Sequence, residues 1–466
     1  MLPRSTPSAQ GVDPRALLDL VEALDADPET ELHSVMVLRH GHVVAEGWWA
    51  PHEPGRARLV YSLSKSFTST ALAFAVAEGL LGLDETVLSH FPELDAEVTD
   101  PRSRATTLRH LAMMASGHDR DMWQEALAGD HTEPVRGFLT VPPDAEPGTL
   151  FAYNQPCTYT VAAAIQRAAG MSLVDYLRPR LLDPLGIGEV GWQAGPPGRQ
   201  LGFTGFFART EDIARLGQLY LQRGAWEGRQ LLDPSYVDLA TAKHVDTAQQ
   251  QDNPDWQQGY GFQFWQSRHG YRGDGAFGQF CVVLPEQDVV VAMTAGTENM
   301  QAVLDHVWAH LVPGLGRTVE DPDTEAALTA RLASLALAPC VADADPEPGT
   351  YAVSGEDAAA TSVVRLEVGD REVTLVEDGD AVTFPIGVGS WARSVRRTAR
   401  GDEIAVAASG GRTSQETRLE VLFVETPHRL DIVCDPATGT AHVAWRIQPL
   451  HEGALRTLCL PRPAAG

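Results

Sequence analysis

The spacing of apolar positions divides the chain into two regions. Up to about residue 313, helical patterns alternate with a few strand patterns. Residues 12–26, VDPRALLDLVEALDA, form an amphipathic pattern that predicts a first helix, with Asp13 as its N-cap and a proline as its first residue. Two apolar runs then surround residues 40–42, and they predict a β-hairpin over residues 33–49.

Residues 260–295 contain apolar runs separated by turn residues, and they predict three further strands with turns near residues 268–270 and 286–288. The two early strands and the three late strands enclose a mainly helical middle. Sequential antiparallel strands that are set apart from helices indicate an α+β fold.

The pattern changes after a helical segment at residues 320–337. Residues 362–389 and 418–435 alternate apolar and polar positions, with Gly-Asp turns in the first of them. We therefore expect three parts, whose bounds are 1–318 for the α+β domain, 319–344 for a helical linker, and 345–466 for a small antiparallel β-sandwich or barrel. We expect the last part to shape or shield a site without supplying catalytic residues.

Composition narrows the function classes. The formal net charge of −26 argues against nucleic acid and anionic membrane as partners, because both require clustered positive charge. The first residues lack the apolar core of a secretion signal, and no segment approaches the length of a membrane span. The five cysteines are scattered without a Cys-x-x-Cys pair, so we expect reduced thiols in a cytoplasmic protein, with neither disulfides nor a metal site.

Lysine is nearly absent from this chain. Of the 36 lysine and arginine residues, only Lys65 and Lys243 are lysines. Lys65 lies in a segment of small and apolar residues, so we expect it to be buried. Because a buried lysine can lose its proton near neutral pH and an arginine cannot, Lys65 is a candidate proton shuttle.

Ser62 precedes Lys65 by three residues, at the expected start of a helix. Residues at this spacing share one helix face, so the amine can take the proton of the serine hydroxyl and make it a nucleophile. A Ser-x-x-Lys pattern often arises by chance on a solvated helix face. Here residues 66–81 are almost all small or apolar, which indicates a buried helix.

Residues 61–93, YSLSKSFTSTALAFAVAEGLLGLDETVLSHFPE, resemble the nucleophile segment of the serine β-lactamase and penicillin-binding-protein superfamily, in its class C β-lactamase, esterase and D-aminopeptidase branch. Further similar stretches follow in order from residues 107, 147, 202 and 273, so the resemblance covers about residues 10–312. It implies a β-lactamase/transpeptidase-like α+β fold, in which helices flank an antiparallel sheet beside an all-helical subdomain, here with a small C-terminal antiparallel β domain.

The resemblance also implies roles for particular residues. Ser62 matches the nucleophile, Lys65 the base, and Tyr153 the tyrosine that completes the proton relay in the family's Tyr-x-Asn motif. Gln155 replaces the motif's asparagine and is one methylene longer, so it can donate to a substrate carbonyl from a shifted position.

The family's third motif, which is Lys-Thr-Gly, His-x-Gly or an aromatic-x-Gly, has two possible registers here. They are Tyr271-Arg272-Gly273 and Gly273-Asp274-Gly275, and neither supplies the usual lysine. Glycines on a strand let a substrate backbone approach closely, and one strand N–H together with the N–H of Ser62 would form an oxyanion hole.

Other polar and aromatic residues have structural explanations of equal or greater weight. Helix packing and turn roles account for a histidine-rich set that could suggest a metal site or a triad: His110, His118 and Asp119. We expect His269 to be an exposed turn residue. Four tryptophans could either line an apolar pocket or belong to the core: Trp123, Trp192, Trp256 and Trp265.

The expected function is hydrolysis of an amide or ester through an acyl-enzyme on Ser62, without a metal or an organic cofactor. The substrate would be a small molecule or a peptide. Two alternatives remain. One is a penicillin-binding-protein-type acyltransferase or peptide-cyclising thioesterase, in which an amine resolves the acyl-enzyme. The other is a catalytically weak binding protein of the same fold, suggested by Gln155 and by the missing third-motif cation.

Overall fold

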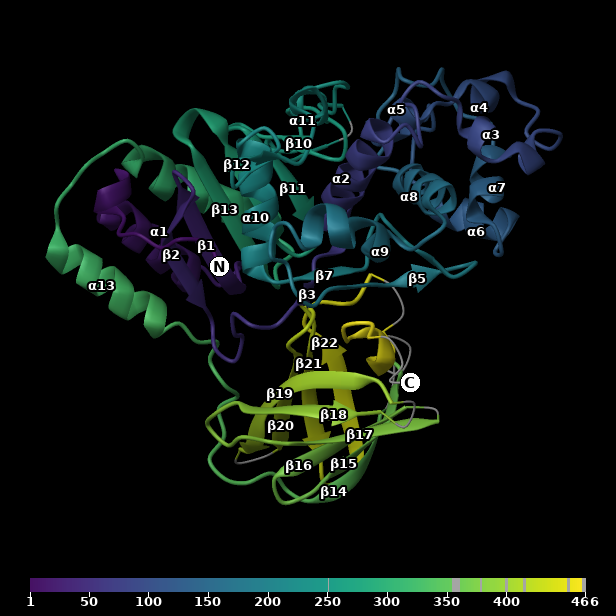
Figure 1. Cartoon of the computed structure of the whole chain (residues 1–466). Coiled ribbons are helices and arrows are strands. Elements are labelled where there is room, and N and C mark those ends of the chain that lie inside the picture. Colours follow the sequence, from purple (N-terminus) through teal and green to yellow (C-terminus); the bar gives the residue numbers. More distant parts are fainter. Residues whose placement is uncertain are drawn as a thin grey trace.

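The computed structural model describes residues 1–249, 251–353, 361–377, 379–398, 401–413, 416–450 and 453–462. A six-stranded sheet with helices around it forms the upper part in Figure 1, and a nine-stranded sheet forms the lower part. Helix α13 (Pro322–Ala333) lies on the path between them.

The six-stranded sheet joins early and late strands, as the sequence predicts. Its order is β10-β11-β12-β13-β1-β2, and every neighbouring pair is antiparallel. The predicted hairpin is confirmed, because β1 and β2 turn at His40 and Gly41, whose φ angles of 49° and 73° are left-handed. The bounds are β1 (Leu32–Arg39), β2 (His42–Trp48), β10 (Trp265–Gln266), β11 (Tyr271–Gly275), β12 (Gln279–Leu284) and β13 (Val289–Ala295).

The prediction of three late strands was wrong, because this region forms four. An additional turn at residues 276–278 separates β11 from β12, and Phe277 and Gly278 have φ angles of 67° and 88° there. Glycines at positions 273, 275 and 278 favour such a turn over a continuous strand. The chain therefore reverses directly after the glycine-rich segment.

Helices cover both faces of this sheet. Helix α1 (Pro14–Ala26) begins as predicted, with the Asp13 carboxylate accepting a hydrogen bond from the backbone N–H of Arg15. It packs against α13 and close to α12 (Met300–His306). Helix α10 (Thr210–Leu221) packs against β12, β13 and β1.

Helix α2 (Ser64–Ala77) is buried on all sides and packs against α8 (Gln155–Ala169). The 3₁₀ turn η2 (Tyr61–Leu63) precedes it, so the regular helix begins two residues later than the sequence predicts. A helix that is apolar or small all round belongs in a core, which explains the composition of residues 66–81. The other α-helices of the described residues are α3 (Val87–His90), α4 (Pro101–Ala105), α5 (Leu108–Ala112), α6 (Trp123–Gly129), α7 (Pro134–Leu139), α9 (Leu173–Leu177) and α11 (Pro234–Thr241).

Short strands complete this part of the molecule. The three-stranded sheet β3-β7-β4 lies between the helices and the nine-stranded sheet in Figure 1. The bounds are β3 (Arg58–Leu59), β4 (Gly191–Trp192), β5 (Ala194–Gly195), β6 (Arg199–Gln200), β7 (Phe206–Ala208), β8 (Ala225–Trp226) and β9 (Arg229–Gln230).

The C-terminal strands form a nearly closed barrel around their own apolar core. The order is β17-β16-β15-β14-β22-β21-β20-β19-β18, and the two end strands β17 and β18 lie side by side. One pair, β14 with β22, is parallel, because an odd number of alternating strands brings the first and last into the same direction. The bounds are β14 (Gly349–Val353), β15 (Val363–Val368), β16 (Glu372–Glu377), β17 (Asp380–Pro385), β18 (Ala392–Arg397), β19 (Glu403–Arg412), β20 (Thr417–Phe423), β21 (Arg429–Asp435) and β22 (Thr440–Trp445).

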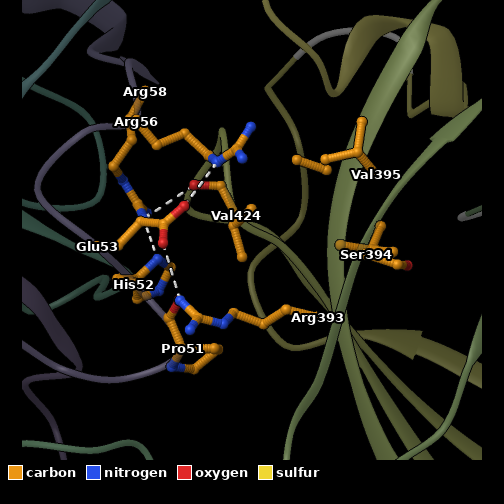
Figure 2. A pocket seen from close by; sticks show the side chains of 11 residues that line it. Pro51, His52, Glu53, Arg56, Arg58, Arg393, Ser394, Val395 and Val424 are labelled. Carbon is orange, nitrogen blue, oxygen red and sulfur yellow. Dashed lines mark hydrogen bonds and ion pairs between the residues drawn. The ribbon is translucent and has the colours of Figure 1, made fainter.

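The barrel contacts the rest of the molecule at several places, and one of them is residues 51–61. Figure 2 shows this junction, where a cavity of about 250 Å³ lies between His52 and Arg58 on one side and Arg393 and Val424 on the other. The Arg58 guanidinium is buried and donates a hydrogen bond to the Val424 carbonyl over 3.1 Å. The segment that leads to Ser62 is thus in direct contact with the barrel.

All five cysteines are buried free thiols. Within the described residues, no helix is long and apolar enough to cross a membrane. The same part of the chain contains no group of three or more His, Cys, Asp or Glu side chains arranged to hold a metal ion.

Candidate active site

Ser62 and Lys65 lie together at the start of α2. The Lys65 Nζ atom is 3.0 Å from the Ser62 Oγ atom. Ser62 is partly exposed, whereas the residues around it from Tyr61 to Ala75 are buried. The Ser62 side chain is thus accessible from solvent, whereas the Lys65 side chain is enclosed.

Burial controls the protonation of Lys65. The side chain is 1% exposed, and its ammonium donates to Ser62 Oγ, to Gln155 Oε1 at 2.7 Å and to the Phe203 carbonyl at 2.9 Å. Burial disfavours the charged form and lowers the pKa of Lys65 to about 7, although nearby carboxylates act in the opposite direction. A pKa near neutral pH allows the Lys65 amine to be neutral there, which a proton shuttle requires.

Tyr153 stands next to this pair on the extended segment before α8. The Lys65 Nζ atom lies 4.6 Å from the centre of the Tyr153 ring, and that ring stacks on Trp265 with centres 5.4 Å apart. Burial raises the pKa of Tyr153, while its hydrogen bond with Ser62 lowers it. The phenol is thus protonated at neutral pH and lies within reach of the nucleophile.

Gln155 is the first residue of α8 and takes part in the lysine network. Its amide oxygen accepts from Lys65, and its amide nitrogen is the side chain's only donor for a substrate carbonyl. Its backbone N–H donates to the Asp121 carboxylate over 2.9 Å.

Asp121 is a site residue that the sequence analysis missed. Its charge favours the protonated form of Lys65, so it limits how far burial lowers the lysine pKa. The same carboxylate oxygen also accepts from the backbone N–H of Trp123 over 3.3 Å. Its place in the charged stretch HDRD, beside Asp119, is a weak sequence signal.

The geometry favours one register of the third motif. A Cβ atom on Gly275 would lie 2.0 Å from the Val60 carbonyl and 3.1 Å from the Ser62 nitrogen. A Cβ atom on Gly273 would lie 2.4 Å from Ser66 Oγ. Strand β11 therefore presses against the start of α2 through both glycines, which brings Gly273-Asp274-Gly275 to the nucleophile.

Tyr271 does not join this group of residues. It is 7% exposed, and its ring packs edge-on against Phe264 with centres 6.0 Å apart. The second register, Tyr271-Arg272-Gly273, would need this ring at the nucleophile, and its packing gives no support for that.

Arg272 and Asp274 form a buried ion pair on the opposite face of β11. The Arg272 Nε atom lies 2.9 Å from the Asp274 carboxylate, and neither residue is more than 7% exposed. Burial raises the pKa of Asp274, and the arginine opposes that shift. Arg272 also lies 4.2 Å from the Trp256 ring. It is enclosed by the protein, so it is not a free cation for a substrate carboxylate.

The remaining candidates have structural roles. His118 contacts Ser116 and the Val141 carbonyl, and the His110 ring accepts a hydrogen bond from the backbone of Thr107. Asp119 is exposed and pairs with a neighbouring arginine. Trp192 packs against Phe206 in the core.

Three of the four tryptophans lie beside residues of the Ser62 site. Trp265 stacks on Tyr153, Trp256 lies next to Trp265, and Trp123 packs against Phe203, whose carbonyl binds Lys65. The expectation that His269 is exposed was wrong. It is half-buried against Trp308, with ring centres 5.0 Å apart.

A family model described as Beta-lactamase matches residues 19–311, which is more than half of the chain. The chain belongs to the Beta-lactamase family. The match begins within α1 and ends just before residue 312, so it contains every residue of the Ser62 site described above. The predicted resemblance is confirmed, and the barrel lies outside the matched family region.

Relatives of this Beta-lactamase family member include hydrolases. A 6-aminohexanoate-dimer hydrolase of Paenarthrobacter ureafaciens is 27% identical over 246 residues, which are 48% of this chain and 60% of that protein. A lovastatin esterase of Penicillium rubens is 30% identical over 148 residues, or 27% of this chain and 37% of that protein. The chain thus spans less than two thirds of the length of these relatives.

A solved structure of SurE with D-Leu shares the fold at 19% identity with a TM-score of 0.51. The similarity covers 90% of this chain and 98% of that structure. The common fold therefore extends beyond the family region into the C-terminal strands.

The lowered pKa of Lys65 predicts how acylation depends on pH. Lys65 accepts a proton only when it is neutral, so the rate of Ser62 acylation should rise with pH through about 7 and then level off. Time-resolved labelling with a fluorophosphonate, from about pH 5 to about pH 9, measures the profile. In Lys65→Arg, the labelling rate should no longer rise with pH, and it should be roughly 100-fold or more below that of wild type. Lys243→Arg changes the exposed second lysine and is the matched control. A wild-type labelling rate that does not change with pH would contradict the prediction.

The close approach of Gly275 predicts a strong effect of one methyl group. Gly275→Ala should push β11 away from the start of α2 and lower the labelling rate of Ser62 by about 100-fold, because small displacements at a reacting centre are costly. Gly55→Ala is the control, since an added Cβ there meets no atom within 4 Å. If folded Gly275→Ala protein is labelled at the wild-type rate, the close contact at Gly275 plays no part in the reaction of Ser62.

Proposed function

We propose that this chain is a serine hydrolase that cleaves an amide or ester through an acyl-enzyme on Ser62. The observation that carries the proposal is the 3.0 Å contact between Ser62 Oγ and a buried lysine whose pKa is about 7. A hydroxyl beside a base that titrates near neutral pH is an activated nucleophile. The roles of the individual residues are part of this proposal.

In the first step, neutral Lys65 takes the hydroxyl proton as Ser62 Oγ attacks the substrate carbonyl carbon. The carbonyl oxygen becomes an oxyanion, held by the N–H of Ser62 and by an N–H of β11 near Gly275. The tetrahedral intermediate collapses and the bond to the leaving group breaks. Tyr153 gives its proton to that group and receives the proton that Lys65 took from Ser62. The products of this step are the acyl-enzyme and the free amine or alcohol.

In the second step, water attacks the acyl-enzyme and reverses the proton movements. Its proton goes to the Lys65–Tyr153 network, the ester bond to Ser62 breaks, and the serine recovers its hydrogen. Gln155 would hold the acyl chain through its amide nitrogen. None of these steps draws on a metal or an organic cofactor.

The substrate is proposed to be a small molecule or a peptide. The names of the two curated relatives, a dimer hydrolase and an esterase, support hydrolysis. Five buried free thiols support a cytoplasmic location. The division into residues 1–318, 319–344 and 345–466 and the alternatives of acyl transfer or weak binding remain predictions.

Intact-protein mass spectrometry tests the nucleophile. Wild-type protein incubated with p-nitrophenyl esters, amino-acid amides and peptide thioesters should gain the mass of one acyl group, and Ser62→Ala should gain none while keeping its fold. Adding an amine distinguishes hydrolysis from acyl transfer by the product formed. Wild-type turnover by Ser62→Ala would eliminate the proposal.

The third motif predicts poor activity on β-lactams. Gly273 stands where the family usually carries a cation, Asp274 adds a carboxylate, and Arg272 is enclosed by the protein. We expect kcat/KM for small esters to exceed that for penicillins and cephalosporins by at least about 100-fold, since an unmatched carboxylate is repelled. Parallel assays with a nitrophenyl ester and a chromogenic cephalosporin measure the ratio. Comparable values would show that another group binds the β-lactam carboxylate.

A further inference from the structure

The turn between β20 and β21, residues 424–428, contacts the segment directly before Ser62. The backbone N–H of Leu59 donates to the Glu425 carbonyl over 2.8 Å. The Arg58 guanidinium donates to the carbonyls of Val424 and Thr426 over 3.1 Å and 3.0 Å. The backbone carbonyls of the turn therefore bind residues 58 and 59, which precede Ser62 by four and three positions.

His428 extends this contact to the residue directly before the nucleophile. Its Nε2 atom is hydrogen-bonded to the Tyr61 hydroxyl, and its Nδ1 atom lies 2.9 Å from the Ile447 carbonyl. A carbonyl accepts only from an N–H, so Nδ1 carries the hydrogen and Nε2 accepts from the tyrosine. Burial lowers the pKa of His428 to about 4, so this neutral tautomer persists at ordinary pH.

Tyr61 and Phe277 hold the backbone at the two sides of the proposed oxyanion hole. Tyr61 precedes Ser62, and Phe277 follows Gly275 by two residues. Both have left-handed φ angles, of 47° and 67°, which non-glycine residues rarely adopt. Such angles persist only where surrounding contacts hold the chain.

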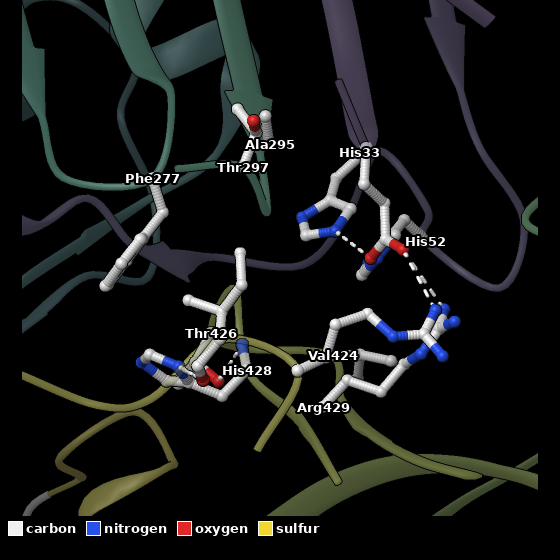
Figure 3. Close-up of polar contacts among 12 residues, drawn as sticks. His33, His52, Phe277, Ala295, Thr297, Val424, Thr426, His428 and Arg429 are labelled. Atoms are coloured by element: carbon white, nitrogen blue, oxygen red, sulfur yellow. Dashed lines mark hydrogen bonds and ion pairs between the residues drawn. The ribbon is translucent and has the colours of Figure 1, made fainter. Parts of the chain in front are cut away.

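The His428 ring contacts both of these residues. Its centre lies 5.8 Å from the centre of the Tyr61 ring and 5.6 Å from that of Phe277, each in an edge-on arrangement. Tyr61 and Phe277 also pack edge-on against each other, with centres 5.3 Å apart. Figure 3 shows Phe277 and His428 facing each other across this junction, with Thr426 beside them.

We propose that His428 of the barrel is a positioning residue, which fixes the two backbone segments that form the oxyanion hole by holding Tyr61 and Phe277. The inference rests on the proposed function, because it concerns the geometry of the same acylation. His428 touches no reacting atom and acts through Tyr61 on Ser62 and through Phe277 on the turn after β11. The barrel is then part of the catalytic apparatus, in addition to any role in shielding the site.

The contact is tested by variants that keep the apolar packing. Tyr61→Phe removes only the hydroxyl. His428→Leu removes both hydrogen bonds, whereas His428→Gln can accept from Tyr61 and donate to Ile447. Tyr351→Phe is the matched control, because it removes a buried tyrosine hydroxyl that bonds to the Glu347 carbonyl within the barrel.

The measured quantity is the second-order rate of fluorophosphonate labelling at Ser62, per folded molecule, across pH. We expect about a tenfold decrease for Tyr61→Phe and at least that for His428→Leu, with partial recovery in His428→Gln. The midpoint of the pH profile should stay near 7, because Lys65 is untouched. The double variant Tyr61→Phe/His428→Leu should lose no more than the more damaged single variant, since both single variants already remove the same Tyr61–His428 hydrogen bond.

A purely structural role predicts a different result. In that case Tyr61→Phe lowers the melting temperature, as Tyr351→Phe does, and the labelling rate of the folded fraction equals that of wild type. That outcome overturns the proposal, and Tyr61→Phe decides it even if His428→Leu fails to fold. Failure of wild-type Ser62 to react at all would instead refute the proposed function.

Discussion

The burial of Lys65 beside Ser62 is the constraint on which the rest of the site depends. Removing an ammonium group from water disfavours its charge, and this moves the pKa of Lys65 to about 7. The three oxygen acceptors around Nζ make that burial tolerable. They come from the start of α2, the start of α8 and the segment before β7, so the position of the lysine requires all three elements to pack together.

The same packing explains why β11 carries glycines. The strand approaches the start of α2 so closely that side chains at Gly273 and Gly275 would overlap Ser66 and Val60. The backbone on that face can then reach a substrate held at Ser62. The opposite face of the strand carries the buried Arg272–Asp274 pair, whose carboxylate acts on Lys65 and Tyr153 through space.

The barrel completes this arrangement from outside the matched family region. Its β20–β21 turn reaches the residues just before Ser62, and His428 lies against both Tyr61 and Phe277. Left-handed backbone at two non-glycine residues needs support from the surrounding structure. Some of that support comes from a part of the chain whose strand pattern carries no sign of chemistry.

Local pattern by itself determined much of this protein. Contacts between residues close in sequence determine four features: the capped first helix, the hairpin at His40, the alternating C-terminal strands and the Ser62–Lys65 spacing. The periodicity of apolar positions reveals such contacts. Only the tertiary structure favours one third-motif register, places Asp121 beside the Lys65 network and supports the role proposed for His428. The Tyr61–His428 bond spans 367 positions, and no local pattern encodes which distant surfaces meet when two apolar cores pack together.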